Sequence, residues 1–246
     1  MVHFVGAGPG AEDLITVRGM KLLGEADVII YAGSLVNPGL LKYARPDCEI
    51  HNSAQMTLDE VIDVIQCHRN KNIVRLHTGD PSLYGAIREQ MDRLIELGIE
   101  YDVCPGVSSF FGAAAALRAE YTLPDVSQTV IITRAAGRTP VPERESVRSL
   151  ATHGATMVFF LSAGLVSTIS CELIEGGYRP DTPAAVVYKA TWPDERIVRG
   201  TIETLPQMMD GITKTALVAV GDFLGDDYTL SRLYAPDFET EYRKAK

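Results

Sequence analysis

The 246-residue sequence lacks the motifs of several common enzyme classes. Its four cysteines form no CxxC pair and its five histidines form no HExxH pattern. We therefore predict no protein-bound metal and expect reduced, structural thiols. There is no P-loop and no nucleophile elbow followed by the partners of a Ser-His-Asp triad, which disfavours nucleotide hydrolysis and acyl transfer. Because no apolar run approaches the ~20 residues that span a bilayer, and the N-terminus has no export pattern, we expect a cytoplasmic protein.

The sequence also lacks the excess of positive charge that nucleic-acid binding requires. Its formal net charge is −9, so we expect neither a nucleic acid nor a membrane as partner. The hydrophobic content of 46% and the length suit one large globular domain or two smaller ones. Net charge does not fix the local field of a binding site, and an anionic small-molecule substrate stays possible.

The first half of the chain repeats an order of strand, small-residue turn and helix. This order predicts a parallel α/β sheet, in which the turns after the strands bind ligands. The expected strands are Val2–Val5, Asp27–Tyr31, Cys48–His51, Ile73–Leu76 and Tyr101–Cys104.

The second half is predicted to form a separate domain. Residues 120–128 contain a proline and show no periodicity, so they are expected to link a parallel α/β domain over residues 1–119 to a mixed α/β domain over residues 129–246. The second domain is mixed because Arg196–Arg199 follows Ala184–Tyr188 closely enough to pair with it antiparallel.

The first strand runs directly into Gly6-Ala-Gly-Pro-Gly10. This spacing is similar to a dinucleotide fingerprint, but Pro9 interrupts the pattern. The acidic residues Glu12 and Asp13 that follow would repel a pyrophosphate. An NAD-binding dehydrogenase is therefore disfavoured.

The turn after Ile73–Leu76 is the strongest candidate for a ligand site. The chain breaks at Gly79 and turns at Asp80-Pro81, and proline favours the first position of a helix that we expect to open near Leu83. Thr78, Gly79 and Asp80 would then line a crevice, although an ordinary strand-to-helix turn is the alternative.

Two residues of this turn are candidate catalytic residues. Asp80 could cap the following helix, or it could orient a cofactor and stabilise positive charge that develops on a ring. Tyr84 is either an aromatic core residue or a pocket wall near the acceptor.

Three strings stand in one order along the chain: Val5-Gly-Ala-Gly-Pro-Gly10, Gly79-Asp-Pro-Ser-Leu-Tyr-Gly85 and Cys104-Pro-Gly-Val-Ser-Ser109. Together they resemble the tetrapyrrole methylase family, and the resemblance spans essentially the whole chain. It implies transfer of a methyl group from S-adenosyl-L-methionine, which yields S-adenosyl-L-homocysteine. It also implies two α/β domains with the cofactor cleft between them, and a homodimer.

Further strings make one branch of the family more similar than the others. They are Tyr31-Ala-Gly-Ser-Leu-Val36, Gly79–Gln90 and Glu120–Thr129. They resemble the branch that methylates precorrin-4 or cobalt-precorrin-4 at C-11 in cobalamin (vitamin B12) biosynthesis. The partner would be a small-molecule tetrapyrrole, a corrinoid precursor, and any cobalt would arrive with it. The alternatives are a methylase for another tetrapyrrole position, a branch acting on RNA or protein, and a non-catalytic tetrapyrrole-binding carrier.

The resemblance also implies a set of binding residues. Those for the cofactor are Pro9, Thr78, Gly79, Asp80, Leu83, Ser108, Ser109, Leu161, Ala190, Thr215, Ala216 and Leu217. Candidate substrate-binding residues are Ser34, in a turn after a strand, and Arg134 and Arg138, since a guanidinium group suits a carboxylate. Tight packing for Ser34 and solvation for the arginines are the alternatives.

Overall fold

The computed structural model describes residues 1–245 and divides into two compact units. Unit 1 comprises Met1–Ala113 and Lys189–Glu195, and unit 2 comprises Ala114–Tyr188 and the described residues from Arg196 onward. The division falls inside the helix α4 (Ser109–Leu117), whereas the sequence-based linker, residues 120–128, lies within unit 2. Lys246, the last residue of the predicted second domain, lies outside the described residues.

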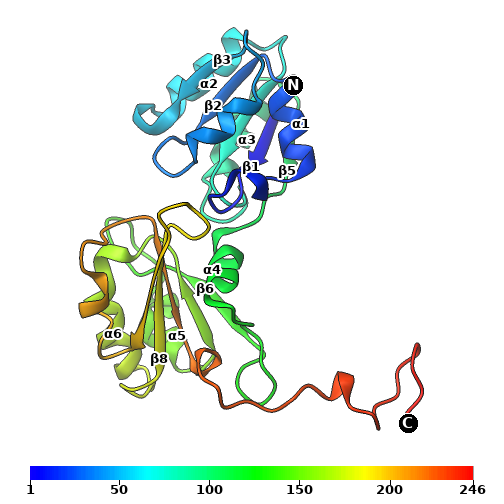
Figure 1. Ribbon diagram of the computed structural model, residues 1–246. Coiled ribbons are helices and arrows are strands. Elements are labelled where there is room, and N and C mark those ends of the chain that lie inside the picture. Colours follow the sequence, from blue (N-terminus) through cyan, green and yellow to red (C-terminus); the bar gives the residue numbers. More distant parts are fainter. Residues whose placement is uncertain (246) are drawn as a thin grey trace. The chain divides into compact units, whose positions relative to one another are not determined.

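Unit 1 is built on a five-stranded sheet in which all neighbouring strands are parallel. Its strands, in the order β3-β2-β4-β1-β5, are β1 (Val2–Gly6), β2 (Val28–Tyr31), β3 (Glu49–Asn52), β4 (Ile73–His77) and β5 (Tyr101–Cys104). Figure 1 labels all of them except β4. The predicted parallel sheet is confirmed. Because every strand runs the same way, all five carboxyl ends lie along one edge.

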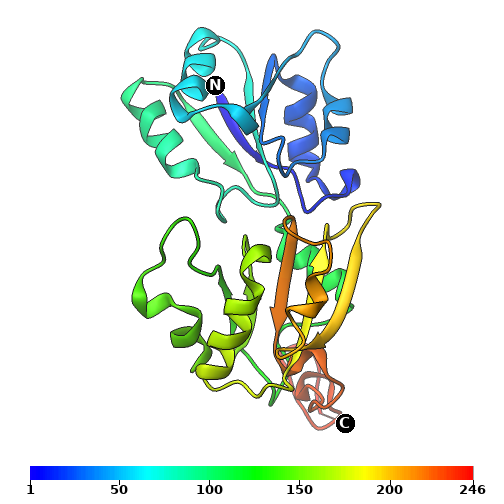
Figure 2. The same cartoon turned by 90° about the vertical axis from the view of Figure 1, so that its left-hand side faces the viewer.

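Helices cover both faces of this sheet (Figure 2). Alternate side chains of β2 face opposite ways: Ile30 packs with α2 (Leu58–Cys67) and α3 (Ile87–Glu96), and Ile29 packs on the side of α1 (Val17–Glu25). Burial on both faces explains the largely apolar sequences of the inner strands β1 and β2, whereas the edge strands β3 and β5 carry exposed polar residues. A capping box begins α2, in which Thr57 and Glu60 each bond to the other's backbone amide.

Unit 2 contains the mixed sheet that the sequence predicts. Its strands, in the order β6-β7-β10-β8-β9, are β6 (Val130–Thr133), β7 (Thr156–Phe159), β8 (Pro183–Tyr188), β9 (Arg196–Thr201) and β10 (Ala216–Val220). Only β6 and β7 are parallel neighbours, and β8 and β9 pair antiparallel as expected. The helices α5 (Val147–Ala151) and α6 (Val166–Glu175) bury their apolar faces against this sheet.

The helix start expected near Leu83, directly after Asp80-Pro81, is wrong, whereas the helix that the sequence predicts over Ala86–Leu97 is confirmed as α3 (Ile87–Glu96). Residues 81–84 form a turn, and α3 begins at Ile87 after two left-handed residues, Tyr84 (φ 57°) and Ala86 (φ 48°). Left-handed residues cannot continue a right-handed helix. Gly85 is required between them, because a Cβ there would overlap the carbonyl of Pro81.

The sequence leads us to expect no membrane-spanning segment and no protein-bound metal. None of the helices within residues 1–245 has the length and apolar character needed to cross a membrane. Over the same residues, no three or more His, Cys, Asp or Glu side chains are grouped so that they could hold a metal ion.

The strand β4 buries two basic side chains, Arg75 and His77, which are 7% and 5% exposed. Burial first, and the nearby charge of Arg75 second, lower the pKa of His77 from 6.5 to about 3. The imidazole therefore stays neutral in the folded protein at pH values where an unfolded histidine takes up a proton.

Folding stability should consequently fall as the pH drops from 6.5 toward 3, since the unfolded state binds a proton that the folded state does not. For His77 alone the expected loss between pH 7 and pH 5 is about 2 kcal/mol. Urea unfolding of wild type and His77→Phe at both pH values measures it, because phenylalanine suits the site beside Phe4. Equal losses in the two proteins would contradict a buried neutral imidazole.

Candidate functional site

The turns that follow β1, β4 and β5 meet at the carboxyl edge of the unit 1 sheet. The Gly79 amide donates to the Gly8 carbonyl at 2.9 Å, and the Gly8 amide donates to the Gly79 carbonyl at 3.2 Å. Gly106 lies against both neighbouring turns: a Cβ there would overlap the Gly79 carbonyl and lie 2.7 Å from Gly6 Cα. Glycine is required because the main chains themselves are in contact.

The Asp80 carboxylate ties two of these turns together. Its Oδ2 accepts a hydrogen bond from the Gly106 amide at 2.8 Å, and its Oδ1 accepts from the Ser82 amide at 2.9 Å and from the Ser82 hydroxyl. Partial burial pushes the pKa of Asp80 upward, but these hydrogen bonds outweigh it and hold the pKa below its ordinary value. The carboxylate is ionised and engaged, which suits an anchor better than a proton acceptor.

Other predicted residues of unit 1 lie around this anchor. The backbone of Ser108 and Ser109 packs against Gly79, where a Cβ would lie 3.4 Å from the Ser109 amide nitrogen. Pro9 fits against Gly112 of α4, where a Cβ would lie only 2.8 Å from Pro9 Cβ. The remaining predicted side chains of this edge are half-buried Thr78 and Leu83, Tyr84 at 43% exposure, and exposed Ser34 in the turn after β2.

Ala190 comes to unit 1 from a distant part of the sequence, in the segment Lys189–Glu195 that connects β8 with β9. The Ala11 amide donates to Thr191 Oγ1 at 2.9 Å, and Gly10 lies so close to the Trp192 indole that a Cβ would overlap it. The sequence-based prediction did not include Thr191 or Trp192. The feature of the sequence that is related to them is Gly10, which must be glycine because the Trp192 indole packs against its Cα.

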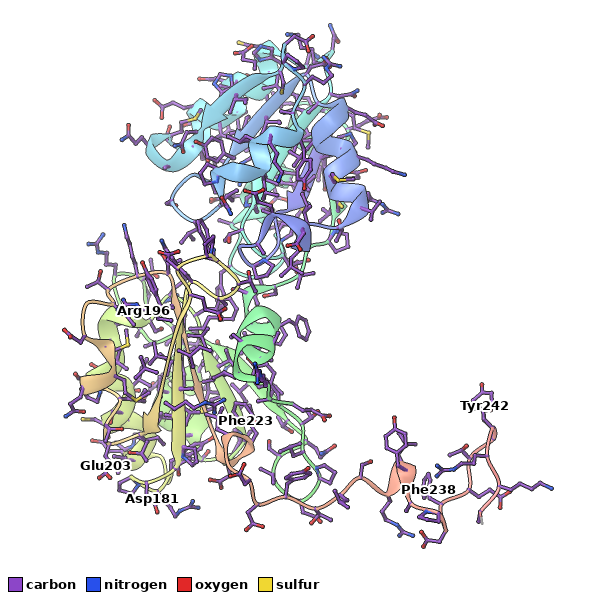
Figure 3. The ribbon with its side chains drawn as sticks, viewed as in Figure 1. Asp181, Arg196, Glu203, Phe223, Phe238 and Tyr242 are labelled. Atoms are coloured by element: carbon purple, nitrogen blue, oxygen red, sulfur yellow. The ribbon has the colours of Figure 1, made fainter. Side chains whose placement is uncertain are left out.

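The predicted residues of unit 2 gather at one edge of its sheet. Since β7 and β10 run antiparallel with Phe159 opposite Val218, Leu161 after β7 lies beside the start of β10 at Thr215–Leu217. The strand β8 ends at the same edge, where Tyr188 pairs with Ala216 and with Arg196, which is labelled in Figure 3. Leu161 is 62% exposed and left-handed (φ 53°), and Thr215 is also left-handed (φ 56°).

The two candidate arginines of unit 2 have different surroundings. Arg134 donates to the carbonyls of Thr139 at 3.1 Å and Pro140 at 2.7 Å, so it stabilises the loop in which it lies. Arg138 is exposed, and no side chain or carbonyl within residues 1–245 pairs with it. Arg138 is therefore the less engaged of the two, although the Nε–H group of Arg134 donates none of these hydrogen bonds, so both arginines stay candidate substrate contacts. Arg196, which lies 4.9 Å from the centre of the Tyr188 ring, is a further cation that the sequence-based prediction missed.

Residues 1–206 match the family model described as Tetrapyrrole (Corrin/Porphyrin) Methylases, and the chain belongs to this family. It is 55% identical to the cobalt-precorrin-4 C(11)-methyltransferase of Methanocaldococcus jannaschii, over 99% of this chain and 96% of that protein. The crystal structure of a cobalt precorrin-4 methyltransferase of cobalamin biosynthesis is 48% identical, with a TM-score of 0.89 over 92% of this chain and 96% of that one. The uroporphyrin-III C-methyltransferase of Thermus thermophilus, solved with S-adenosylhomocysteine, is 27% identical, with a TM-score of 0.77 over 91% and 98%. The family and the fold predicted from the sequence are confirmed.

Gly106→Ala should destabilise unit 1, because the added methyl group meets backbone atoms that cannot rotate away. We expect a loss of about 1–3 kcal/mol in the free energy of unfolding, measured by urea titration. Gly24→Ala in α1 is the matched control: its Cβ would lie 3.6 Å from the Tyr43 carbonyl, an ordinary distance. That variant should gain up to ~1 kcal/mol from helix propensity. Wild-type stability in Gly106→Ala would show that the three turns are not in direct contact.

Proposed function

We propose that the protein is an S-adenosylmethionine-dependent methyltransferase that methylates C-11 of cobalt-precorrin-4, or of precorrin-4, in cobalamin biosynthesis. The observation that carries the proposal is the 55% identity to the cobalt-precorrin-4 C(11)-methyltransferase of Methanocaldococcus jannaschii over 99% of this chain. The resemblance of the chain to this branch also leads us to propose a cytoplasmic homodimer.

We propose that the turns of unit 1 bind the cofactor that this reaction requires. S-adenosylmethionine supplies a methyl group that its sulfonium centre already activates. Half-buried Ser109 and Thr78 are proposed to give hydroxyl groups to its polar ends and half-buried Leu83 to give apolar surface, while the buried residues Pro9 and Ser108 would support these turns from behind. The Thermus thermophilus relative, which was solved with S-adenosylhomocysteine, supports this cofactor class. The assignments of Leu161, Ala190 and Thr215–Leu217 to the adenosyl part stay predictions.

Methyl transfer of this kind depends on alignment more than on acid–base groups, and alignment can contribute ~7–11 kcal/mol. We propose that Asp80 serves this end by fixing Gly106 and Ser82, through the hydrogen bonds of its two carboxylate oxygens. Tyr84, which is 43% exposed on a left-handed turn, is proposed to face the acceptor ring. Ser34 and Arg138 are proposed to contact the substrate's polar groups.

Binding of S-adenosylhomocysteine, measured by calorimetry, tests the cofactor assignment. Wild type should bind with micromolar affinity, and Asp80→Asn should bind roughly tenfold more weakly, since a charge-assisted hydrogen bond contributes about 1.5–3 kcal/mol. Asp92→Asn, which breaks an exposed pair with Arg88 on α3, is the control and should bind as wild type does. Folded wild-type protein that fails to bind would refute the assignment and favour a tetrapyrrole carrier.

Methyl incorporation into cobalt-precorrin-4 and into precorrin-4, supplied separately, tests the acceptor. Arg138→Ala should raise the KM for the tetrapyrrole about tenfold and leave S-adenosylhomocysteine binding unchanged, because it removes one guanidinium–carboxylate contact. The control is Arg148→Ala, which removes an exposed arginine that pairs with Glu175. An unchanged KM in Arg138→Ala would rule this residue out as a substrate contact.

A further inference from the structure

The strand β4 carries a buried cation that no carboxylate neutralises. Arg75 is 7% exposed, and it forms no ion pair with any residue between positions 1 and 245. Burial lowers the pKa of Arg75 to about 10, so the guanidinium stays charged at neutral pH. A buried charge is costly unless hydrogen bonds compensate it. The hydrogen bonds of the Arg75 guanidinium therefore identify the parts of the fold that it connects.

These bonds form a chain that crosses unit 1. Arg75 Nη1 donates to the Ile30 carbonyl of β2 at 3.2 Å, and Arg75 Nε donates to Gln90 Oε1 of α3 at 3.0 Å. The amide of Gln90, itself 5% exposed, donates in turn to the Ala86 carbonyl at 3.0 Å. The buried arginine is thus connected to the last residue before α3.

That residue ends a turn whose backbone is strained. Ala86 (φ 48°) and Tyr84 (φ 57°) are both left-handed without being glycine, a conformation that persists only where the surroundings enforce it. No side chain caps the start of α3. The hydrogen bond from the Gln90 amide to the Ala86 carbonyl therefore adds a side-chain contact at the point where the turn ends and the helix begins.

We propose that Arg75 and Gln90 are positioning residues for methyl transfer. Through the Ala86 carbonyl they hold the turn that carries Leu83 and Tyr84, and so set the places of these two side chains at the carboxyl edge of the sheet. This inference rests on the proposed function, because it assigns the turn to the cofactor and acceptor site.

Gln90→Glu isolates the last bond of the chain. A glutamate oxygen still accepts from Arg75 Nε, but it has no hydrogen to donate to the Ala86 carbonyl. We expect the variant to keep wild-type thermal stability and to bind S-adenosylhomocysteine and S-adenosylmethionine at least fivefold more weakly. Adding Ala86→Gly, which makes the left-handed backbone favourable, should restore at least half of the lost affinity on a logarithmic scale.

Two further variants keep the test decisive. Arg75→Met combined with Gln90→Met replaces the buried polar groups by apolar side chains of similar size, which often leaves stability unchanged or higher. It should show the same loss of affinity. Arg93→Gln breaks an exposed pair with Asp59 on the same helix and should behave as wild type.

The outcomes separate this inference from the proposed function. Wild type that does not bind S-adenosylhomocysteine refutes the proposed function itself. Wild type that binds, together with stable Gln90 variants of equal affinity, overturns the positioning role alone. Weakened binding that Ala86→Gly restores supports it, since a purely structural role for Gln90 would not produce that rescue.

Discussion

Direct contact between the main chains of Gly6, Gly79 and Gly106 is the constraint on which the unit 1 site depends. The strands β4, β1 and β5 are adjacent and parallel, so their following turns leave the sheet only about 5 Å apart. No side chain fits between these turns. The Asp80 carboxylate links two of them by accepting a hydrogen bond from the Gly106 amide. The sheet topology thus dictates both the glycines and the place of the carboxylate.

The mixed sheet of unit 2 also brings segments that are distant in the sequence together at one edge, but it does so through antiparallel pairing. Its antiparallel pairs bring the ends of β7 and β8 to the same edge as the starts of β9 and β10. For this reason Leu161 and Thr215 are neighbours in space although they are far apart in the sequence. A parallel sheet would have placed them at opposite edges. Because of the antiparallel pairs, residues that follow one strand and residues that precede another lie at the same edge of the sheet.

The sequence predicts the strands β1, β2 and β4 well, because burial on both faces leaves runs of apolar residues in them. It wrongly places a helix start near Leu83, because Asp80 followed by Pro81 has the same local chemistry as a true helix start. What decides the matter is the contact of Gly85 with the Pro81 carbonyl, which depends on the finished fold. Long-range contacts hide the role of Trp192 in the same way, since its partner Gly10 lies at the other end of the chain.

Residues with a strained, left-handed backbone are concentrated near the predicted binding residues. Among residues 1–245, six of the eight left-handed residues that are not glycine belong to or adjoin the predicted site segments, namely Tyr84, Ala86, Leu161, Lys189, Thr191 and Thr215. Each costs roughly 1–2 kcal/mol that glycine at the same position would avoid. Glycine would also remove the side chain, and Tyr84 and Leu161 are exposed, so core packing does not account for retaining them. Their strain and exposure support the proposal that these side chains contact cofactor or substrate.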